Sequence, residues 1–520
     1  MTKLWHDSLL YRLLAWIAVW LADGPFGRFH RRLTALRRQS LAHSLLMRLL
    51  RRDDPAAQSG LRAALDRFHA SVYRHADGLA ARWKESMLYR LCRALFLRLR
   101  ESVLLGWLFA SGVTGAILYG VGVYGLIDCL LRDVLPLPVF SSVWDELFLF
   151  FGLFWIALTR ITARKPVRSR LNSVDLSVGA FLLVGAALLF CVHPFPQVAI
   201  AGYRATMQYL LWFYIITRLL RNDRDVTLLV HTLVAAATLI ALHGIYQYII
   251  AVPIPASWTD ASEGAVRTRV FSIFGSPNIM GDFLVLFAPI TVGLAYSARD
   301  NRKKLLFWVC ALCMCLSCLF TMSRGAWVGL VVAVVVFSLL VDRRLLFLML
   351  LAGVCSLFLP FVASRIGYLF SPEYAASAAR GGRSVRWEQA LSYLYREDKW
   401  FGVGFGMFGG AIAMQFKPIA SLTYFYVDNY YMKILTENGY LGLIFFVGMM
   451  AILLFCGAKA CIRRKHGTRA PLPAGILAGL CGVLTHCFFE NIFEEPYMMV
   501  YFWVCAGILI YLGFLWDETN

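Results

Sequence analysis

Residues 438–457, with the sequence NGYLGLIFFVGMMAILLFCG, contain no charged side chain. A helix of about 20 predominantly apolar residues is long enough to cross the roughly 30 Å hydrocarbon core of a bilayer. Comparable runs recur along the 520-residue chain, which is 59% hydrophobic and only 16% charged. This composition is not that of a soluble domain, and it predicts a polytopic membrane protein.

The apolar runs predict about twelve transmembrane helices. They fall at residues 104–126, 142–160, 175–192, 203–220, 226–250, 281–297, 305–322, 325–341, 344–361, 438–457, 472–489 and 497–515. Because the runs are continuous rather than alternating, they are typical of spanning helices and exclude a closed β-barrel. The expected fold class is therefore an all-α polytopic membrane protein with a large extracytoplasmic loop.

The cationic loops give an orientation, since short cytoplasmic loops carry an excess of Lys and Arg. With a cytoplasmic N-terminus, all five Lys- and Arg-rich loops fall on the cytoplasmic side. The predicted organisation is a basic cytoplasmic or interfacial region (1–100), membrane helices (101–361), an extracytoplasmic loop domain (362–437) and C-terminal membrane helices (438–520). Both chain ends are then cytoplasmic. In this arrangement Arg267, Arg269 and Arg324 lie outside and break the rule that the rest of the chain follows.

The first 100 residues carry 19 Lys and Arg against 7 Asp and Glu, a net charge of +12 out of +20 for the chain. The segments SLLYRLL (8–14), SLLMRLL (44–50) and SMLYRLC (86–92) are near-repeats in which Leu and Arg take different helical faces. This pattern favours interfacial helices on anionic membrane lipids, with docking of a protein as the alternative. Nucleic-acid binding is not expected.

The thirteen cysteines include the stretch CALCMCLSC at 310–318, whose spacing superficially resembles a metal site. The stretch lies inside an apolar run without a neighbouring His or carboxylate. We therefore expect packing residues there and no metal.

The segment 362–437 is far longer than an ordinary connection, which is typical of a functional loop. The stretch SVRWEQALSYLYRE (384–397) has helical spacing, and the glycine-rich WFGVGFGMFGG (400–410) predicts a turn in the chain. The glycine spacing is a weak match to a phosphate-binding fingerprint, because no parallel-strand context accompanies it.

A group of arginines is expected at the outer mouth, and guanidinium is well suited to bidentate contact with phosphate. Its members are Arg267, Arg269, Arg324, Arg380, Arg383 and Arg386. Asp428 and Asn429 stand where the chain re-enters the membrane. One carboxylate facing several arginines suits a reaction in which a phosphate-type group leaves while a nucleophile loses a proton.

Four stretches together resemble the O-antigen ligase and polymerase superfamily of bacterial cell-envelope glycosyltransferases. They are RVFSIFGSPNIMGDF (269–283), TMSRGAW (321–327), RWEQALSYLYREDKWFGVGFGMF (386–408) and DNYYMKILTENGYLGL (428–443). The resemblance covers roughly residues 175–515. It implies a multi-pass enzyme of the bacterial cytoplasmic membrane that uses a glycan on undecaprenyl diphosphate and a glycan or lipid acceptor. It also implies an inverting reaction without a metal or other cofactor.

The resemblance also assigns roles to individual residues. Arg269 and Arg324 would hold the diphosphate, and Arg386 with Trp387 would mark a loop helix that covers the site. Asp428 stands where many members have His before the Asn, which leaves open both the catalytic base and the choice between ligase and polymerase. The expected substrate-binding set is Arg267, Arg269, Asn278, Arg324, Arg383, Arg386 and Trp387, the catalytic pair is Asp428 and Asn429, and the alternative bases are His486 and Glu490.

Two other classes of function remain open from the sequence. An anion or bicarbonate transporter would place its charged residues near the middle of the membrane on broken helices, often within an inverted repeat. A scaffold for envelope polysaccharide assembly would use the basic N-terminal helices for docking. The charges gathered at one face favour the glycosyltransferase over both.

Overall fold

The computed structural model describes residues 85–87, 90–91, 94, 112–135, 138–161, 171–255, 258, 268–368, 370–372, 382–418, 427–463 and 471–515. The chain divides into two compact units, Met1–Ala94 and Leu95–Asn520. Most of the basic near-repeats, together with Arg267 and Arg380, lie outside the described residues. The second unit carries the membrane helices and the candidate site.

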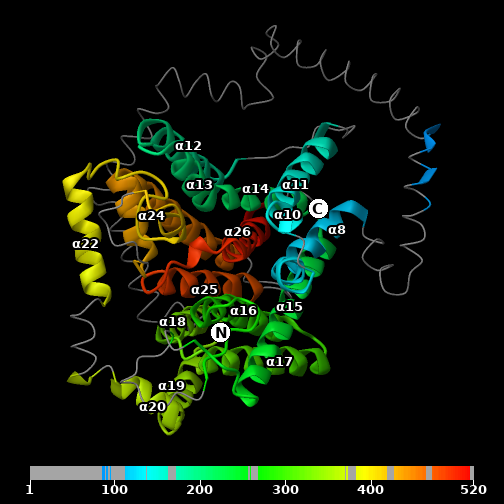
Figure 1. Ribbon diagram of the computed structural model, residues 1–520. Coiled ribbons are helices and arrows are strands. Elements are labelled where there is room, and N and C mark those ends of the chain that lie inside the picture. Colours follow the sequence, from blue (N-terminus) through cyan, green and yellow to red (C-terminus); the bar gives the residue numbers. More distant parts are fainter. Residues whose placement is uncertain are drawn as a thin grey trace, which may run out of the picture. The chain divides into compact units, whose positions relative to one another are not determined.

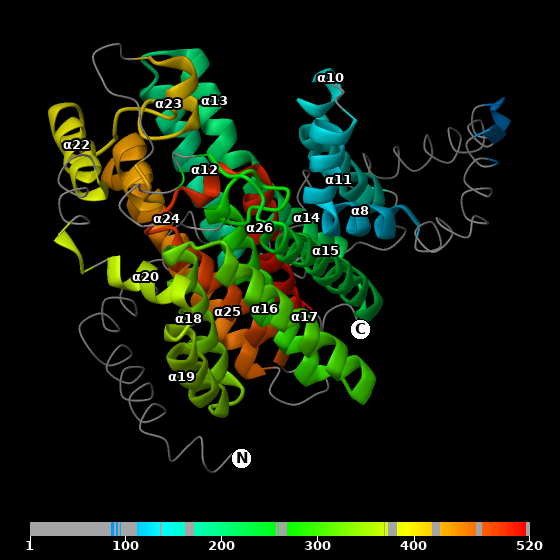
Figure 2. The same ribbon diagram turned by 60° about the horizontal axis from the view of Figure 1, so that its bottom comes forward.

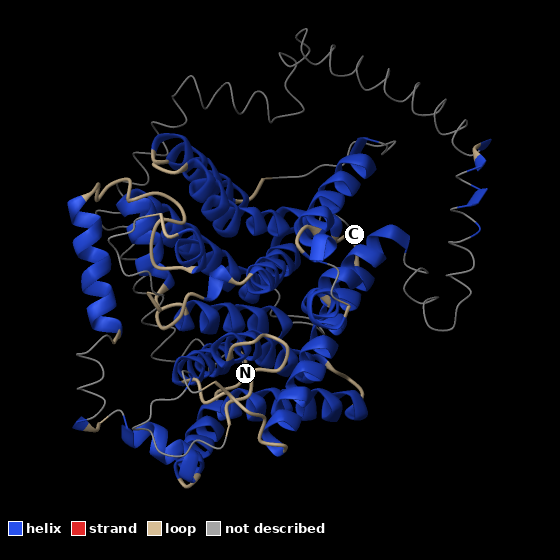
Figure 3. Ribbon diagram, viewed as in Figure 1, coloured by secondary structure: helices blue, strands red, loops and turns tan. Residues whose placement is uncertain are grey.

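Every regular element among the described residues is a helix, as Figure 3 shows. The first half contains α8 (Gly112–Gly122), α9 (Tyr124–Cys129), η2 (Leu130–Val134), α10 (Pro138–Ser141), α11 (Trp144–Ile161), α12 (Ser173–Cys191), α13 (Pro196–Met207), η3 (Gln208–Leu210), α14 (Leu211–Leu219) and α15 (Asp223–Ile249). The middle contains α16 (Pro277–Ser297), α17 (Asn301–Phe320), α18 (Arg324–Leu340), α19 (Arg344–Leu357) and α20 (Pro360–Tyr368). The last part contains α22 (Arg383–Arg396), α23 (Ala411–Phe416), α24 (Tyr430–Arg463), α25 (Pro471–His486), η6 (Ile492–Glu494), α26 (Pro496–Ile510) and η7 (Tyr511–Leu515).

The predicted all-helical membrane fold is confirmed at this level. Among the described residues, 6 helices are long and apolar enough to cross a membrane, or up to 8 if each bent pair is one span. Each apolar run predicted from the sequence overlaps a helix, but the count of about twelve spans stays a prediction. Helices α18 and α25 have 17 and 16 residues, which is short for a span.

Helix α25 packs closely against α16 and α18 (Figure 1). A Cβ on Gly479 would lie 2.4 Å from the Leu286 carbonyl oxygen, and one on Gly475 would lie 2.5 Å from that of Pro289. Glycine at these two positions therefore lets the backbones of α16 and α25 touch, as small residues commonly do between membrane helices. This contact holds α16 and α25 side by side, and candidate residues lie at or just beyond one end of each helix.

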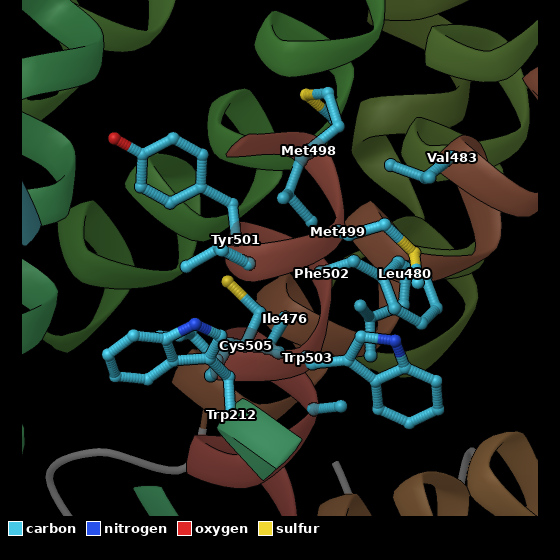
Figure 4. Packing of buried hydrophobic residues seen from close by; sticks show 14 of the residues in the cluster. Trp212, Ile476, Leu480, Val483, Met498, Met499, Tyr501, Phe502, Trp503 and Cys505 are labelled. Carbon is cyan, nitrogen blue, oxygen red and sulfur yellow. The ribbon is translucent and has the colours of Figure 1, made fainter. Parts of the chain in front are cut away.

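Helix α26 is buried along its whole length and packs against α14 and α25. Figure 4 shows side chains of α25, among them Ile476 and Leu480, gathered with those of α26. The Tyr501 hydroxyl accepts a hydrogen bond from the Gly125 amide at 2.8 Å, which ties α26 to α9. The core thus joins the C-terminal helices to helices of the first half of the chain.

The connection between α20 and α24 contains the predicted helix, which is α22. It lies beside α24 in both views (Figures 1 and 2). Ala390 and Leu394 are buried on one side of α22, as their spacing predicted. The glycine-rich segment 402–410 is buried as well, and the amides of Val403 and Gly404 donate to carbonyls of α24. The segment is therefore a packed part of the fold.

Candidate functional site

Arg269 lies in the segment that leads from α15 to α16. Its guanidinium donates to the carbonyl oxygens of Trp258 at 2.6 Å and Thr321 at 3.1 Å, and to Asn278 Oδ1 at 3.2 Å. The Gln247 side chain holds the same segment by accepting from the Ser272 amide at 2.7 Å. These contacts fix Arg269 between the end of α17 and the start of α16.

Asn278 connects Arg269 to a carboxylate. It lies in the first turn of α16, directly after Pro277, and its Nδ2 donates to Glu490 Oε2. Helix α25 stops at His486 and Glu490 lies beyond its end, so Glu490 and His486 do not share a helical face. Glu490 is half-buried and can face the other groups of the site.

His486 lies behind this carboxylate in the protein interior. Its Nδ1 is 3.0 Å from Asp282 Oδ1, and both side chains are almost completely buried. A Cβ on Gly325 would lie 2.8 Å from His486 Nε2, so the α18 backbone covers the other ring nitrogen. The imidazole is therefore closed off on both nitrogens, and this geometry is a poor one for direct contact with a substrate.

Arg324 is the first residue of α18. Its guanidinium carbon lies 5.9 Å from the centre of the Tyr368 ring at the end of α20, within reach of a cation–π contact. The next residue, Gly325, also packs on Phe489, since a Cβ there would lie 3.0 Å from Phe489 Cβ. Arg324 thus lies close to the turn that follows α25.

Helix α22 brings two further arginines to this turn and to Asp428. Arg383 Nη2 donates to the Phe489 carbonyl at 2.9 Å, and its Nε lies 4.0 Å from Asp428 Oδ2. Arg386 Nη1 lies 2.5 Å from the same carboxylate oxygen. Trp387 Nε1 donates to the Val427 carbonyl at 3.1 Å. One face of α22 therefore holds the backbone and side chain of residues 427–428.

Asp428 has a left-handed backbone, with φ of 50°, an uncommon conformation for a residue other than glycine. Burial and the negative charge of Glu490 raise the pKa of its carboxyl to about 6, against the lowering effect of Arg386 and Arg383. Unusual backbone geometry and a shifted pKa in one residue are common features of functional sites. Asp428 is the strongest candidate for chemistry among the residues that the structure describes.

Asn429 follows at the start of α24 and is buried. Its Oδ1 accepts from the Met432 amide at 3.1 Å, as a residue that caps a helix does. The backbone amide of Asn429 donates to Asn491 Oδ1 at 3.2 Å. The side chain of Asn429 is therefore engaged in capping α24.

A group of buried charges that was not predicted from the sequence lies beside this site. Lys433 Nζ lies 2.6 Å from Glu437 Oε1 and 3.5 Å from Glu494 Oε1. Glu494 also accepts from the Ala411 amide at 3.2 Å, and burial raises the pKa of its carboxyl to about 7. The spacing of Lys433 and Glu437 by four residues is visible in the sequence, but their link to Glu494 is not.

The structure thus brings most of the predicted residues together around the turn after α25 and the start of α24. They are Arg269, Asn278, Arg324, Arg383, Arg386, Trp387, Asp428, Asn429 and Glu490. The class defined by fold and site is a multi-pass helical membrane protein with a carboxylate held among arginines.

One comparison with known families agrees with this class. A family model described as O-antigen ligase matches residues 309–447, from within α17 to within α24. The match includes Arg324, Arg383, Arg386 and Asp428. It confirms the resemblance seen in the sequence and supports an O-antigen ligase or polymerase type of membrane enzyme. No curated protein matches the chain.

Proposed function

We propose that this protein is a membrane glycosyltransferase that transfers or polymerises a glycan from an undecaprenyl diphosphate carrier onto an acceptor hydroxyl. The reaction takes place at the outer face of the bacterial cytoplasmic membrane. The observation that carries the proposal is Asp428, a carboxylate in a strained turn that is held by Arg386 and neighboured by Arg383. The family match adds the glycan chemistry.

In this proposal the arginines bind the diphosphate of the donor. Arg324, Arg383 and Arg386 come from two different helices, and their guanidinium groups are suited to paired contacts with phosphate oxygens. Arg269 donates hydrogen bonds to two backbone carbonyls and to Asn278, so in this proposal it holds Asn278 and the neighbouring backbone in place. Positive charge placed in advance stabilises the negative charge that develops on the leaving group.

Asp428 accepts the proton of the acceptor hydroxyl. With the pKa of its carboxyl near 6, about nine in ten copies are ionised at pH 7. As the hydroxyl oxygen forms a bond to the anomeric carbon, its proton passes to the carboxylate and the bond from that carbon to the diphosphate breaks. The diphosphate leaves with the electron pair, and Asp428 then returns the proton to water. A direct displacement of this kind inverts the anomeric carbon, and we propose that it needs no metal.

The test uses purified protein in liposomes with a lipid-diphosphate glycan donor and an acceptor glycan. We expect Asp428→Asn to lower transfer by about 10² to 10⁴-fold, the usual contribution of a general base. Asp428→His should retain activity, because imidazole can accept the same proton. Asp300→Asn is the matched control, since Asp300 caps α17 and asparagine caps equally well.

A separate outcome would point to another base. If Asp428→Asn turns over like the wild type while His486→Ala is inactive, the proton acceptor lies at the end of α25. Uptake of an anion into the same liposomes, without glycan transfer by the wild type, would favour the alternative of a transporter.

A further inference from the structure

We infer that Asn491 is a positioning residue that holds the Asp428 turn in its reactive geometry. This inference rests on the proposed function, because it concerns the base of that reaction. Asn491 is not part of any pattern in the sequence that suggested chemistry. It lies immediately after Glu490 and immediately before η6.

The side chain of Asn491 bridges two segments that are distant in the sequence. Its Oδ1 accepts from the Asn429 amide at 3.2 Å, and its Nδ2 donates to the Gly409 carbonyl at 2.9 Å. Gly409 in turn accepts from the Val427 amide at 3.2 Å. The backbone on both sides of Asp428 is thus held by one small group of hydrogen bonds centred on Asn491 and Gly409.

These bonds matter because the backbone of Asp428 is not in a preferred conformation. A non-glycine residue with φ near 50° costs free energy, and it persists where the surroundings determine it. Asn491 itself is buried, with 3% of its surface exposed. Removal of the Asn491 side-chain amide would take one hydrogen-bond partner from the backbone amide of Asn429 and one from the Gly409 carbonyl. Because the site is buried, water cannot readily replace that side chain.

The second support for this arrangement is the anchoring of the Gly409 segment. Val403 and Gly404 donate to carbonyls of α24, and the Ala411 amide donates to Glu494. The segment is therefore fixed at both ends and provides Asn491 with a rigid acceptor. Asp428 is held from one side by this segment and from the other by α22, through Trp387 and Arg386.

The inference separates Asn491 from a residue that merely stabilises the fold. If Asn491 acts through Asp428, its truncation moves the carboxylate away from the acceptor hydroxyl while the donor arginines stay in place. A displacement of about 1 Å can lower the rate by about 100-fold. We expect Asn491→Ala to lower kcat by about 10- to 100-fold and to change KM for the donor by less than about threefold.

The decisive test is a double-mutant cycle in the liposome assay. Once Asp428→Asn has removed the base, moving residue 428 should have no further effect. The double variant Asp428→Asn with Asn491→Ala should therefore transfer glycan at the rate of Asp428→Asn alone. Independent effects that multiply would overturn the inference. The matched control is Asn438→Ala, a truncation of another buried amide on α24 whose side-chain N and O have no hydrogen-bond partner among the described residues.

A measurement that does not depend on activity distinguishes failure of this inference from failure of the proposed function. Hydrogen exchange of the peptide covering residues 427–436 should become faster in Asn491→Ala and stay unchanged in Asn438→Ala. Unchanged exchange in both variants would overturn the positioning role. If exchange is faster in Asn491→Ala but the wild-type protein transfers no glycan, the positioning role of Asn491 stands and the proposed reaction is contradicted.

Discussion

The contact between Arg386 and Asp428 makes a specific prediction about pH. Arg386→Met removes the charge nearest the carboxylate while it keeps much of the side-chain length. Because Arg386 lowers the pKa of the Asp428 carboxyl, its loss should raise that pKa above about 6. A raised pKa leaves fewer carboxylates ionised at neutral pH, so the acidic limb of the pH–rate profile should move to higher pH.

The size of this shift follows from the geometry. An opposite charge in direct contact lowers a carboxyl pKa by about 1 to 3 units. The two side chains are 33% and 21% exposed, so solvent screening places the effect in the lower part of that range. The pKa in the variant should then be about 7 to 8. At pH 7 the ionised fraction in the free enzyme falls from about nine-tenths to between about half and one-tenth, so kcat/KM for the donor should fall about two- to tenfold from this cause.

The assay is glycan transfer in liposomes between pH 5 and pH 9, with kcat and KM for the lipid-diphosphate donor measured separately. At pH 9 the carboxylate is ionised in both proteins, so the pH-dependent part of the loss should disappear, and the difference that remains measures how far Arg386 stabilises the leaving diphosphate. A contribution of Arg386 to donor binding would appear as a higher KM at every pH. Arg396→Met, on an exposed position of the last turn of the same helix, is the control. An acidic limb that does not move would refute the assignment of Asp428 as the base.

Two further predictions concern the donor site and the topology. Arg324→Lys keeps the charge but loses the planar fork of the guanidinium, so glycan transfer should fall about 10- to 100-fold, which corresponds to a loss of about 1.5 to 3 kcal/mol. The matched variant Arg344→Lys, at the start of α19, should stay active. Full activity in both Arg324→Lys and Arg324→Ala would show that Arg324 does not bind the donor. For the topology, a cysteine at Lys399 should react with an impermeant thiol reagent in intact cells and one at Lys465 should not, in a background whose exposed native cysteines are replaced by serine. Reversed labelling would place the arginine site on the cytoplasmic side.

The helices could be predicted from the sequence because a long apolar run has few alternatives in a membrane. Their interruptions could not. The run 104–126 contains the break between α8 and α9, and the run 203–220 contains the turn η3. In α24 the backbone departs from helical geometry at Gly439, with φ of 65°. Such breaks depend on what packs against the helix, and hydropathy carries no information about that.

Part of the candidate site could also be predicted, because its arginines stand out on the side of the membrane that the loop charges predict to be outside, where cationic residues are rare. The contacts among the other polar residues at and behind the site could not be predicted. The bond between Asn278 and Glu490 joins residues 212 positions apart, and the pair of Asp282 and His486 joins residues 204 positions apart. Only the packing of α16 against α25 brings these residues together. The same packing buries His486, one of the two alternative bases named from the sequence.

The position of Asp428 between two opposing influences has a consequence for the order of events. Burial and Glu490 raise the pKa of its carboxyl, while Arg386 and Arg383 lower it. A donor diphosphate bound to these arginines would share their positive charge and weaken their effect on Asp428. The carboxyl pKa would then rise further toward neutrality, where a general base is most effective.

In this scheme the arginines would couple the binding of the donor to the strength of the base. Asp428 would accept a proton most readily when a diphosphate is in place to leave. The same reasoning accounts for a carboxylate at a position where the resemblance to the O-antigen ligase and polymerase superfamily implies histidine. A carboxyl whose pKa has been raised from its ordinary value toward neutrality can perform the proton transfer that imidazole performs without such a shift.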